Sequence, residues 1–349
     1  MKDSRKVTLR QVAEQAGVSI ASVSRVMRNL PVKEGTRAKA EAAIRALNYA
    51  PNLAARALKT NSTQTIACST RVMLRGQLSP LLASIEKTAR DAGYTLILLG
   101  AEETIEGQRK TLQFLASRGI DGLIFSAAIE HDAVLQEMLR KLNIPVVFLD
   151  RDPIDDIDAV IISHGHGIEA AVRHLHSLGH TRIALLTMPG SILPGRERIN
   201  AYKRTLQACK LPFQAEWLSE KCLDDRSVFQ QASFMLSSKN PPTALIAGGV
   251  SLLAGVLRAV YEKGLSVGRD ISVVAGADSE LAELCYPGIT ATRWDMAEHG
   301  RVATELLLER IQNLQIAGGR VVSIPTELIV RDSTQPPTVS SDTFRTDPF

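Results

Sequence analysis

Aromatic residues, cysteines and long apolar runs are all scarce in this sequence, and each absence excludes a class of protein. Aromatic side chains account for 4% of the 349 residues, too few for a large aromatic binding surface. The four cysteines lie far apart and without C-x-x-C spacing, which argues against a disulfide framework and for thiols in a reducing compartment. No apolar run reaches the roughly 18 residues that span a bilayer. The basic first ten residues lack the apolar segment of a secretory signal, so we expect a cytoplasmic protein that does not enter a membrane.

The motifs of common catalytic sites are missing as well. The sequence has no G-x-S-x-G, P-loop or G-x-G-x-x-G stretch, and no nucleophile has an identifiable base. Five of the seven histidines do cluster, at His164, His166, His174, His176 and His180. Of these, His176 and His180 have the i, i+4 spacing of metal ligands on a helix, but no cysteine or carboxylate clearly joins them. We therefore expect no enzyme activity, no metal site and no cofactor.

Positive charge is concentrated at the N-terminus. Residues 1–60 hold twelve Lys and Arg against four Asp and Glu, a net charge of +8, whereas the remainder holds 29 basic and 33 acidic residues, a net charge of −4. A basic block on a mildly acidic chain is typical of a module that binds phosphates. A helix face that is only exposed to solvent can carry the same excess of Lys and Arg. The charge alone therefore does not establish nucleic-acid binding, and the residue pattern has to be considered.

The pattern from Thr8 onward predicts two short helices joined by a tight turn. Thr8 and Gln11 form a capping box, apolar residues recur at helical spacing up to Ala16, and Gly17 supplies the left-handed residue that ends a helix. Ser19 can cap the second helix. We expect four side chains of that helix to face inward: Ile20, Val23, Val26 and Met27. With a third helix over about residues 33–47, this is a helix-turn-helix unit.

In such a unit the second helix enters the major groove with its N-terminal residues against base edges. The base-reading candidates are Ile20, Ala21 and Arg25. Arginine can bond guanine O6 and N7 together, whereas Ile20 and Ala21 can contact thymine methyl groups. Polar side chains nearby predict phosphate contacts that position the unit without reading sequence; the candidates are Ser19, Ser22, Ser24, Thr36 and Tyr49. A small helical bundle with incidental serines is the alternative.

The segment after the third helix favours DNA binding over a plain bundle. Pro51 stops the third helix, and the alanine-rich residues 53–59 form barely two turns, which is too short for a stable isolated helix. We expect this hinge helix, with Ala55 and Leu58, to be ordered by a partner helix or by DNA. Leu58 is suited to insert between base steps in the minor groove as an apolar wedge.

Together these motifs resemble the lactose/galactose repressor family of bacterial transcriptional regulators. The resemblance covers about residues 7–333 and rests on Val12-Ala13-x-x-Ala16-Gly17-Val18-Ser19, on Val23-Ser24-Arg25-Val26 and on Leu47-Asn48-Tyr49-x-Pro51-Asn52. Ile20-Ala21 is more similar to the galactose type of base reader than to the lactose type. Two departures are visible: the loop from Arg28 to Lys33 is shorter than usual, and Lys33 stands where a capping serine is common.

From about residue 62 onward, short β-rich runs alternate with helical stretches. Strands are predicted at residues 65–70, 94–100, 120–126, 144–150, 159–163, 182–187, 243–248 and 271–275. This alternation predicts parallel sheets flanked by helices, and so many βα units suit two lobes better than one open sheet. The resemblance implies a periplasmic-binding-protein-like fold whose chain crosses between the lobes near residues 160, 290 and 322.

The expected organisation has four parts. A helix-turn-helix headpiece occupies residues 1–50, a hinge helix and linker 51–61, a two-lobed effector-binding and dimerisation domain 62–333, and a disordered tail 334–349. The N-lobe is expected at about 62–160 and 290–322, and the C-lobe at about 161–289 and 323–333. The tail is rich in Pro, Ser, Thr and Asp and has no leucine heptad, which favours a dimer over a tail-tied tetramer.

Ligands of parallel sheets bind at the carboxyl ends of the strands, here in a cleft between the lobes. By resemblance, the effector-binding candidates are Asp150, Arg198, Gly248, Val250, Asp278 and Trp294. Arg198 suits ligand hydroxyls or carboxylates, with an internal salt bridge as the alternative. Trp294 can stack on a sugar or a base, or simply pack between the lobes. Gly248-Gly249 stands where the family has Asn-Asp, and Ala277 where it has an aspartate, which weakens the assignment of a sugar.

These features predict a sequence-specific DNA-binding transcriptional regulator, taken as a repressor because most of the family repress. It is expected to bind a palindromic operator on double-stranded DNA as a homodimer, with paired Leu58 wedges at a central CG-type step. A small-molecule effector, a sugar or sugar derivative, is expected to control DNA affinity from the cleft. The alternative is a cytosolic small-molecule binding protein on the same fold without a regulatory role.

Overall fold

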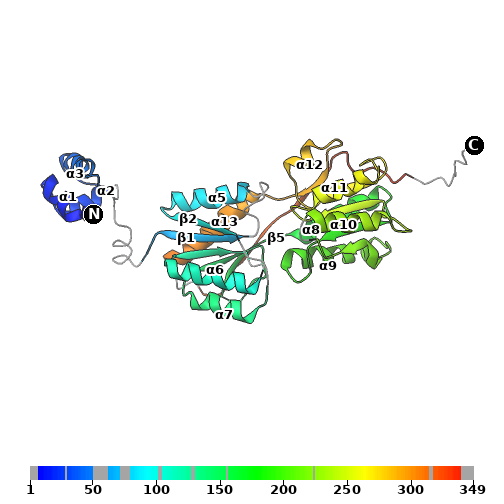
Figure 1. The fold of residues 1–349 in the computed structure, drawn as a ribbon, viewed down its shortest axis with the longest axis horizontal. Helices are drawn as coiled ribbons and strands as arrows, with labels where there is room; N and C mark the ends of the chain where they lie inside the picture. Colours follow the sequence, from blue (N-terminus) through cyan, green and yellow to red (C-terminus); the bar gives the residue numbers. More distant parts are fainter. Residues whose placement is uncertain are drawn as a thin grey trace, which may run out of the picture. The chain divides into compact units, whose positions relative to one another are not determined.

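The computed structural model describes residues 7–27, 30–49, 62–70, 79–100, 104–126, 130–154, 156–222, 225–313 and 317–338. The chain divides into two units, Met1–Thr63 and Gln64–Phe349, which Figure 1 shows as ribbons. The predicted hinge helix, with Ala55 and Leu58, lies outside the described residues.

The first unit contains three short helices: α1 (Leu9–Ala16), α2 (Ile20–Met27) and α3 (Glu34–Ala46). The predicted capping box is present, because the Thr8 hydroxyl accepts the Gln11 N–H while the Gln11 side chain accepts the Thr8 N–H. Gly17 ends α1 with a left-handed φ of 62°. The turn between α1 and α2 is therefore the tight turn of a helix-turn-helix unit.

The core of this unit is small and made mostly of alanine and valine. Its buried members are Val12, Ala13, Ala16, Val23, Val26, Ala40 and Ala43. The expectation that Ile20 faces inward is wrong, since 47% of this residue is exposed. Ile20 is the first residue of a short helix and lies at the end of the core, where it is left open to solvent.

The N-lobe of the second unit is built on a six-stranded sheet of order β11-β5-β4-β3-β1-β2, in which all neighbours are parallel. Its strands are β1 (Thr65–Thr70), β2 (Thr95–Gly100), β3 (Gly122–Phe125), β4 (Val146–Leu149), β5 (Asp158–Ile162) and β11 (Val321–Ile324). The helices α5 (Ser79–Asp91) and α13 (Met296–Gln312) cover one face, and α6 (Ile105–Arg118) and α7 (Ala133–Lys141) the other (Figure 1). A Cβ at Gly122 would lie 2.9 Å from Leu307 Cδ1, so glycine allows α13 to pack directly on β3.

The C-lobe has a second six-stranded sheet, of order β12-β10-β9-β8-β6-β7. Its strands are β6 (Ile183–Thr187), β7 (Leu218–Ser219), β8 (Ala244–Gly248), β9 (Ser272–Ala275), β10 (Thr290–Arg293) and β12 (Glu327–Ile329). The helices α8 (His164–Ser177) and α9 (Leu193–Ala208) cover one face, and α10 (Asp225–Leu236) and α11 (Leu253–Glu262) the other (Figure 1). The short α12 (Glu280–Leu284) follows β9. Only β12, at the edge, pairs antiparallel to its neighbour among the described strands.

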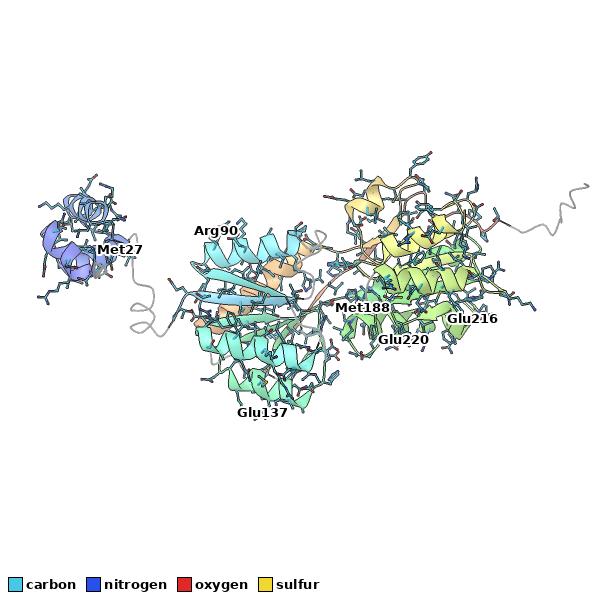
Figure 2. The ribbon with its side chains drawn as sticks, viewed as in Figure 1. Met27, Arg90, Glu137, Met188, Glu216 and Glu220 are labelled. Atoms are coloured by element: carbon cyan, nitrogen blue, oxygen red, sulfur yellow. The ribbon has the colours of Figure 1, made fainter. Side chains whose placement is uncertain are left out.

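The central strands of both sheets are buried on both faces, as their near-continuous runs of apolar residues require. Figure 2 draws the side chains of the strands and of the helices that cover them. Helices on two sides of a mostly parallel sheet define the doubly wound α/β class, so the predicted fold class is confirmed for both lobes.

The chain crosses between the lobes three times. It leaves the N-lobe after β5, returns after β10 to form α13, and leaves again between β11 and β12. All three crossings lie a few residues beyond the expected positions, because Ile162, Arg293 and Ile324 still pair within their own sheets.

The prediction that the disordered tail starts at residue 334 is wrong, because residues 333–335 are bonded to the C-lobe. Ser333 and Thr334 are buried, and the Ser333 hydroxyl donates to the Val273 carbonyl at 2.6 Å. The Gln335 carbonyl accepts from His180 Nε2 at 2.9 Å. The polar composition of this segment was misleading, since its side chains and backbone bond to the C-lobe sheet rather than to water. Residues 339–349 lie outside the described part of the chain.

Candidate functional sites

The first candidate site is the exposed N-terminal end of α2. Ser19 caps the helix, since its hydroxyl accepts the Ser22 N–H at 3.1 Å, and the two hydroxyls lie 2.9 Å apart. Ile20 and Ala21 follow directly and are both exposed. The residues predicted to read bases therefore stand on the surface, on a helix end whose direction is fixed by its cap.

Arg25, the third predicted base reader, is exposed and held by the loop that follows α2. Its Nε donates to the Pro31 carbonyl at 3.2 Å, and Arg37 donates to the neighbouring Leu30 carbonyl at 3.0 Å. An arginine has five N–H donors, so the bond to Pro31 orients the Arg25 guanidinium and leaves its Nη groups suited to paired recognition of guanine.

The predicted phosphate-contacting residues are divided between α2, α3 and the end of the unit. Ser19 is exposed, and the other four, Ser22, Ser24, Thr36 and Tyr49, are half-buried. Lys33 precedes α3 and makes no side-chain cap bond there. The first backbone N–H groups of a helix form a ready anion site, so this end of α3, which also carries Thr36, suits a phosphate.

The second candidate site lies at the lobe junction, where the buried His164 and Arg198 and the partly exposed Asp150 form a row. Asp150 follows β4 in the N-lobe, His164 begins α8, and Arg198 lies on α9. His164 Nε2 is 2.9 and 3.0 Å from the Asp150 carboxylate oxygens, and His164 Nδ1 is 2.8 Å from Arg198 Nη2. Arg198 also donates to the Pro194 carbonyl at 3.1 Å. The structure thus brings the predicted Asp150 and Arg198 together through a histidine.

The donors in this row determine the tautomer of His164. A guanidinium can only donate, so Nδ1 accepts from Arg198 and the proton resides on Nε2, which donates to Asp150. Burial and the charge of Arg198 lower the pKa of His164 to about 4. Burial also lowers the pKa of Arg198, to about 10. Burial alone would raise the pKa of Asp150, but His164, His299 and Arg151 together outweigh it and lower this pKa. At neutral pH the row is therefore a cation, a neutral imidazole and an anion.

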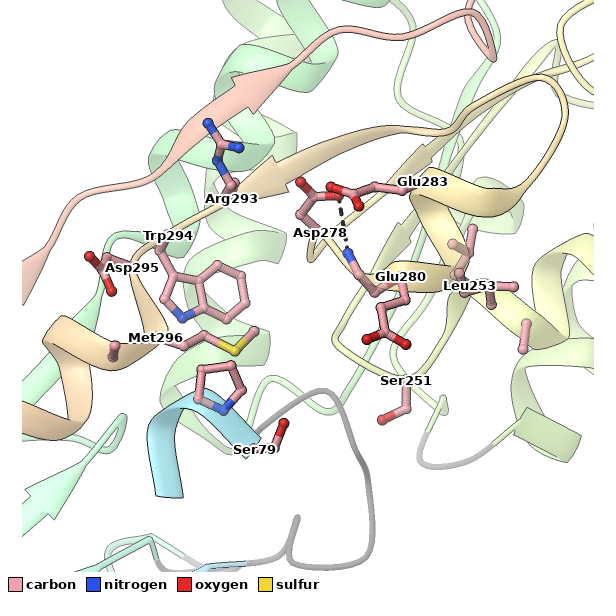
Figure 3. Close-up of a pocket in the computed structure, with 15 residues that line it drawn as sticks. Ser79, Ser251, Leu253, Asp278, Glu280, Glu283, Arg293, Trp294, Asp295 and Met296 are labelled. Atoms are coloured by element: carbon pink, nitrogen blue, oxygen red, sulfur yellow. Dashed lines mark hydrogen bonds between the residues drawn. The ribbon is translucent and has the colours of Figure 1, made fainter. Parts of the chain in front are cut away.

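Trp294 connects this row to a wide cleft. Its ring meets the His164 ring edge-on, with centroids 5.8 Å apart and planes at 86°. Trp294 also lines the cleft of about 1010 Å³ shown in Figure 3. Lining residues from both lobes include Ser79, Ser251, Asp278, Glu280, Asp295 and Met296. Asp278 is paired with Arg331 at 2.8 and 2.9 Å, so this carboxylate is balanced by an internal cation.

In the sensing domain, the chain departs from the family pattern at Gly248-Gly249 and at Ala277, and the structure shows what these residues contact. Gly248 packs backbone to backbone, since a Cβ at Gly276 would lie 2.7 Å from Gly248 Cα. Val250, Ala277 and Trp294 belong to one apolar cluster with N-lobe residues. Where the family has polar ligand contacts, this chain therefore has backbone and apolar packing.

The sequence does not single out His164, because it is one of five clustered histidines, whereas the structure places it between Asp150 and Arg198. The cluster does not converge: His176 is exposed, whereas His180 is buried and bonded to Thr243, Ser272 and Gln335. The signal that identifies His164 is its position directly after a strand of a parallel sheet. Within the described residues, the one group with metal-ligand spacing is Glu130, His131 and Asp152, whose ligand atoms lie within 4.8 Å of one another.

Comparison with known proteins finds relatives of both parts of the chain. Residues 8–52 match the family model of bacterial regulatory proteins of the lacI family, and residues 172–334 match a periplasmic binding protein-like domain. The lactose operon repressor of Escherichia coli K12 is 32% identical over 335 residues, covering 95% of this chain and 92% of the relative. The ribose operon repressor of the same strain is 32% identical over 306 residues, covering 87% and 93%.

A solved structure extends the similarity to the fold. The Lac repressor dimer bound to operator and the anti-inducer ONPF aligns with a TM-score of 0.80 at 30% identity, covering 95% of this chain and all of that one. Among the helices that the structure describes, none combines the length and hydropathy needed to cross a bilayer.

A helix-turn-helix unit joined to a two-lobed α/β domain defines a DNA-binding transcriptional regulator with a ligand-sensing domain. The identity and coverage of its relatives identify the family: the chain belongs to the lacI family of bacterial regulatory proteins.

Proposed function

We propose that the chain represses transcription in the cytoplasm by binding a palindromic operator as a homodimer, under the control of a small-molecule effector. The observation that carries this proposal is the exposed, capped N-terminal end of α2 on a chain that also holds a two-lobed sensing domain. Operator binding by the similar Lac repressor supports it. The proposal assigns no catalytic step to the chain.

The headpiece reads DNA through α2 in this proposal. Ile20 and Ala21 contact thymine methyl groups, Arg25 bonds a guanine in the major groove, and the polar side chains around them bind phosphates. Ala55 and Leu58 lie in the hinge segment, where Leu58 acts as a minor-groove wedge at a central CG-type step. In a dimer, two such units face two half-sites, because protein two-fold symmetry is mirrored in the operator.

The dimer surface is assigned to exposed apolar residues of the C-lobe. Leu284 is 84% exposed and Tyr286 97% exposed, and Leu281 and Tyr261 are exposed as well. Burial raises the pKa of Tyr261 on α11, and the charge of the nearby Cys285 thiol, which follows α12, raises this pKa further. An apolar patch on α11 and α12 is typical of a protein interface, and a closed pair of identical patches gives a two-fold dimer.

The effector site is assigned to the interlobe cleft, with a sugar or sugar derivative as the ligand. The names of the lactose and ribose operon repressors support this class. Trp294 offers an aromatic face and Asp278 a carboxylate in the cleft. The proposal adds Val250, which packs in the same apolar cluster as Trp294, and Gly248 at the end of β8. Asp150 and Arg198 are assigned to the same site, and a ligand that reaches them would bind two groups that are already bonded to His164.

A selection experiment tests the DNA-binding part. The purified chain should enrich palindromic sites from a random DNA pool, and Arg25→Ala should lose the preference at one position of each half-site. A pool that remains random would favour a small-molecule binding protein without a regulatory role.

A further inference from the structure

A cluster of charged side chains joins the two lobes at a place that the proposed function does not use. Glu130 and Asp152 lie in loops of the N-lobe, and Leu193 and Arg196 lie in the first turn of α9 in the C-lobe. The Leu193 N–H lies 3.1 and 2.9 Å from the two Glu130 carboxylate oxygens. Arg196 Nη2 donates to the two oxygens of Asp152 at 2.6 and 2.5 Å.

These contacts supply a cap that α9 does not provide itself. The first turn of a helix has N–H groups without intrahelical acceptors, and a cap residue normally bonds one of them. The α9 N-cap is Ile192, which has no side-chain cap bond, and no acidic residue lies in the first turn. Glu130 takes over this role from the other lobe, since its carboxyl group accepts the Leu193 N–H.

The charges around the cap are balanced and largely withdrawn from solvent. The Glu130 side chain is 4% exposed, with Arg151 Nε at 3.6 Å and Arg196 Nη2 at 3.7 Å. Asp152 is also bonded to His131 Nε2 at 2.5 Å. Two carboxylates face two guanidinium groups, so we interpret the group as an ion-pair cluster and not as a cation site. Ion pairs that are partly buried are screened less by solvent than exposed pairs.

Two residues of this cluster lie close in sequence to two residues of the Asp150–His164–Arg198 row. Asp152 follows Asp150 by two residues, and Arg196 precedes Arg198 by two residues on the same helix. Separation of the lobes would therefore break the helix cap and the Asp152–Arg196 pair together, and would move the segments that hold Asp150 and Arg198.

We propose that Glu130, Asp152 and Arg196 form an interlobe latch, in which the N-lobe caps α9 and holds the lobes in the arrangement described here. Opening of the latch exposes the Leu193 amide and frees α9 to move with the C-lobe. The latch itself depends only on the two-lobed fold. A link from the latch to operator affinity would rest on the proposed function.

Amide hydrogen exchange of the full chain without DNA or ligand tests the latch. The variants are Arg196→Gln, which removes the ion pair, and Glu130→Ala, which removes the cap. The matched control is Arg204→Gln, which makes the same charge change at an exposed position on the same helix. We expect both latch variants to speed exchange at Leu193 by about tenfold relative to the control, because losing a cap or a charge-assisted hydrogen bond favours local opening.

Two results would overturn the proposal. Exchange at Leu193 that matches the control would mean that the contacts do not hold the lobes. Exchange that rises equally at Leu193 and in β8, at the centre of the C-lobe sheet, would mean that the cluster only stabilises the C-lobe as a whole. Because no DNA is present, neither result depends on whether the chain binds an operator.

Discussion

Acidification should destabilise the two-lobed domain, and the buried side chain of His164 should cause a separate, measurable part of the loss. Its Nδ1 accepts from Arg198 and its Nε2 donates to Asp150, so a second proton would place an N–H donor against the guanidinium. Burial and the Arg198 charge therefore lower the pKa of His164 to about 4, against about 6.5 for an unfolded histidine. Between these values the unfolded state binds more protons, so the free energy of unfolding must fall as pH falls.

The pKa difference sets the size of this effect. A depression from about 6.5 to about 4 corresponds to about 3 kcal/mol, on the basis of 1.36 kcal/mol per unit. This stability is fully present above pH of about 6.5 and is lost as pH falls to about 4. The His164→Gln variant keeps an acceptor and a donor in the side chain but does not titrate, so the slope should be missing from it.

Urea unfolding of both proteins at several pH values between 7 and about 4.5 measures the difference, with Trp217, buried in the C-lobe, as a fluorescence probe. The comparison isolates His164, because the other titrating groups contribute to the pH dependence of unfolding in both proteins. One of them is Glu130, since burial raises the pKa of this group to about 7. Equal slopes for wild type and His164→Gln would refute the reasoning, as would an imidazole NMR titration of His164 near pH 6.5.

Three further substitutions test other parts of the molecule. Arg25→Ala should weaken operator binding by about 1–3 kcal/mol and relax specificity at one base pair of each half-site, as measured by fluorescence anisotropy on single-base operator variants; a uniform loss on all sequences would speak against base reading. Leu58→Ala should weaken binding to operator more than to random DNA, and equal losses would argue against a minor-groove wedge. Leu284→Glu should convert dimers to monomers in sedimentation experiments, whereas Phe234→Glu, at an exposed phenylalanine on α10, should not; a dimer that survives Leu284→Glu would place the interface elsewhere.

The headpiece was the part of the chain most accessible from sequence. The capping box at Thr8, the left-handed Gly17 and the serine cap at Ser19 are local features, and each takes the predicted form. Burial was harder to foresee. Ile20 fits the apolar spacing of α2, yet it is exposed because nothing covers the first residue of this short helix.

In the sensing domain, strand positions and parallel topology followed from periodicity, but the site contacts did not. Asp150 and Arg198 are predicted ligand contacts, but the sequence does not predict that His164 joins them. Glu130 and Arg196 could not be paired in advance, because their contact depends on how two lobes meet. The buried Ser333 and Thr334 show the same limit, since polar composition does not reveal which backbone groups need partners.

The central claim is that a ligand in the cleft controls DNA binding, and operator titrations with and without small molecules test it most directly. The selected operator would be titrated with the chain alone and with a panel of sugars, sugar acids, sugar phosphates and nucleosides. We predict that one class changes the dissociation constant by about 5- to 150-fold, the usual range of a coupling free energy, and that Trp294→Ala reduces this change. An operator affinity that no compound alters would contradict the claim and leave a DNA-binding protein without an effector.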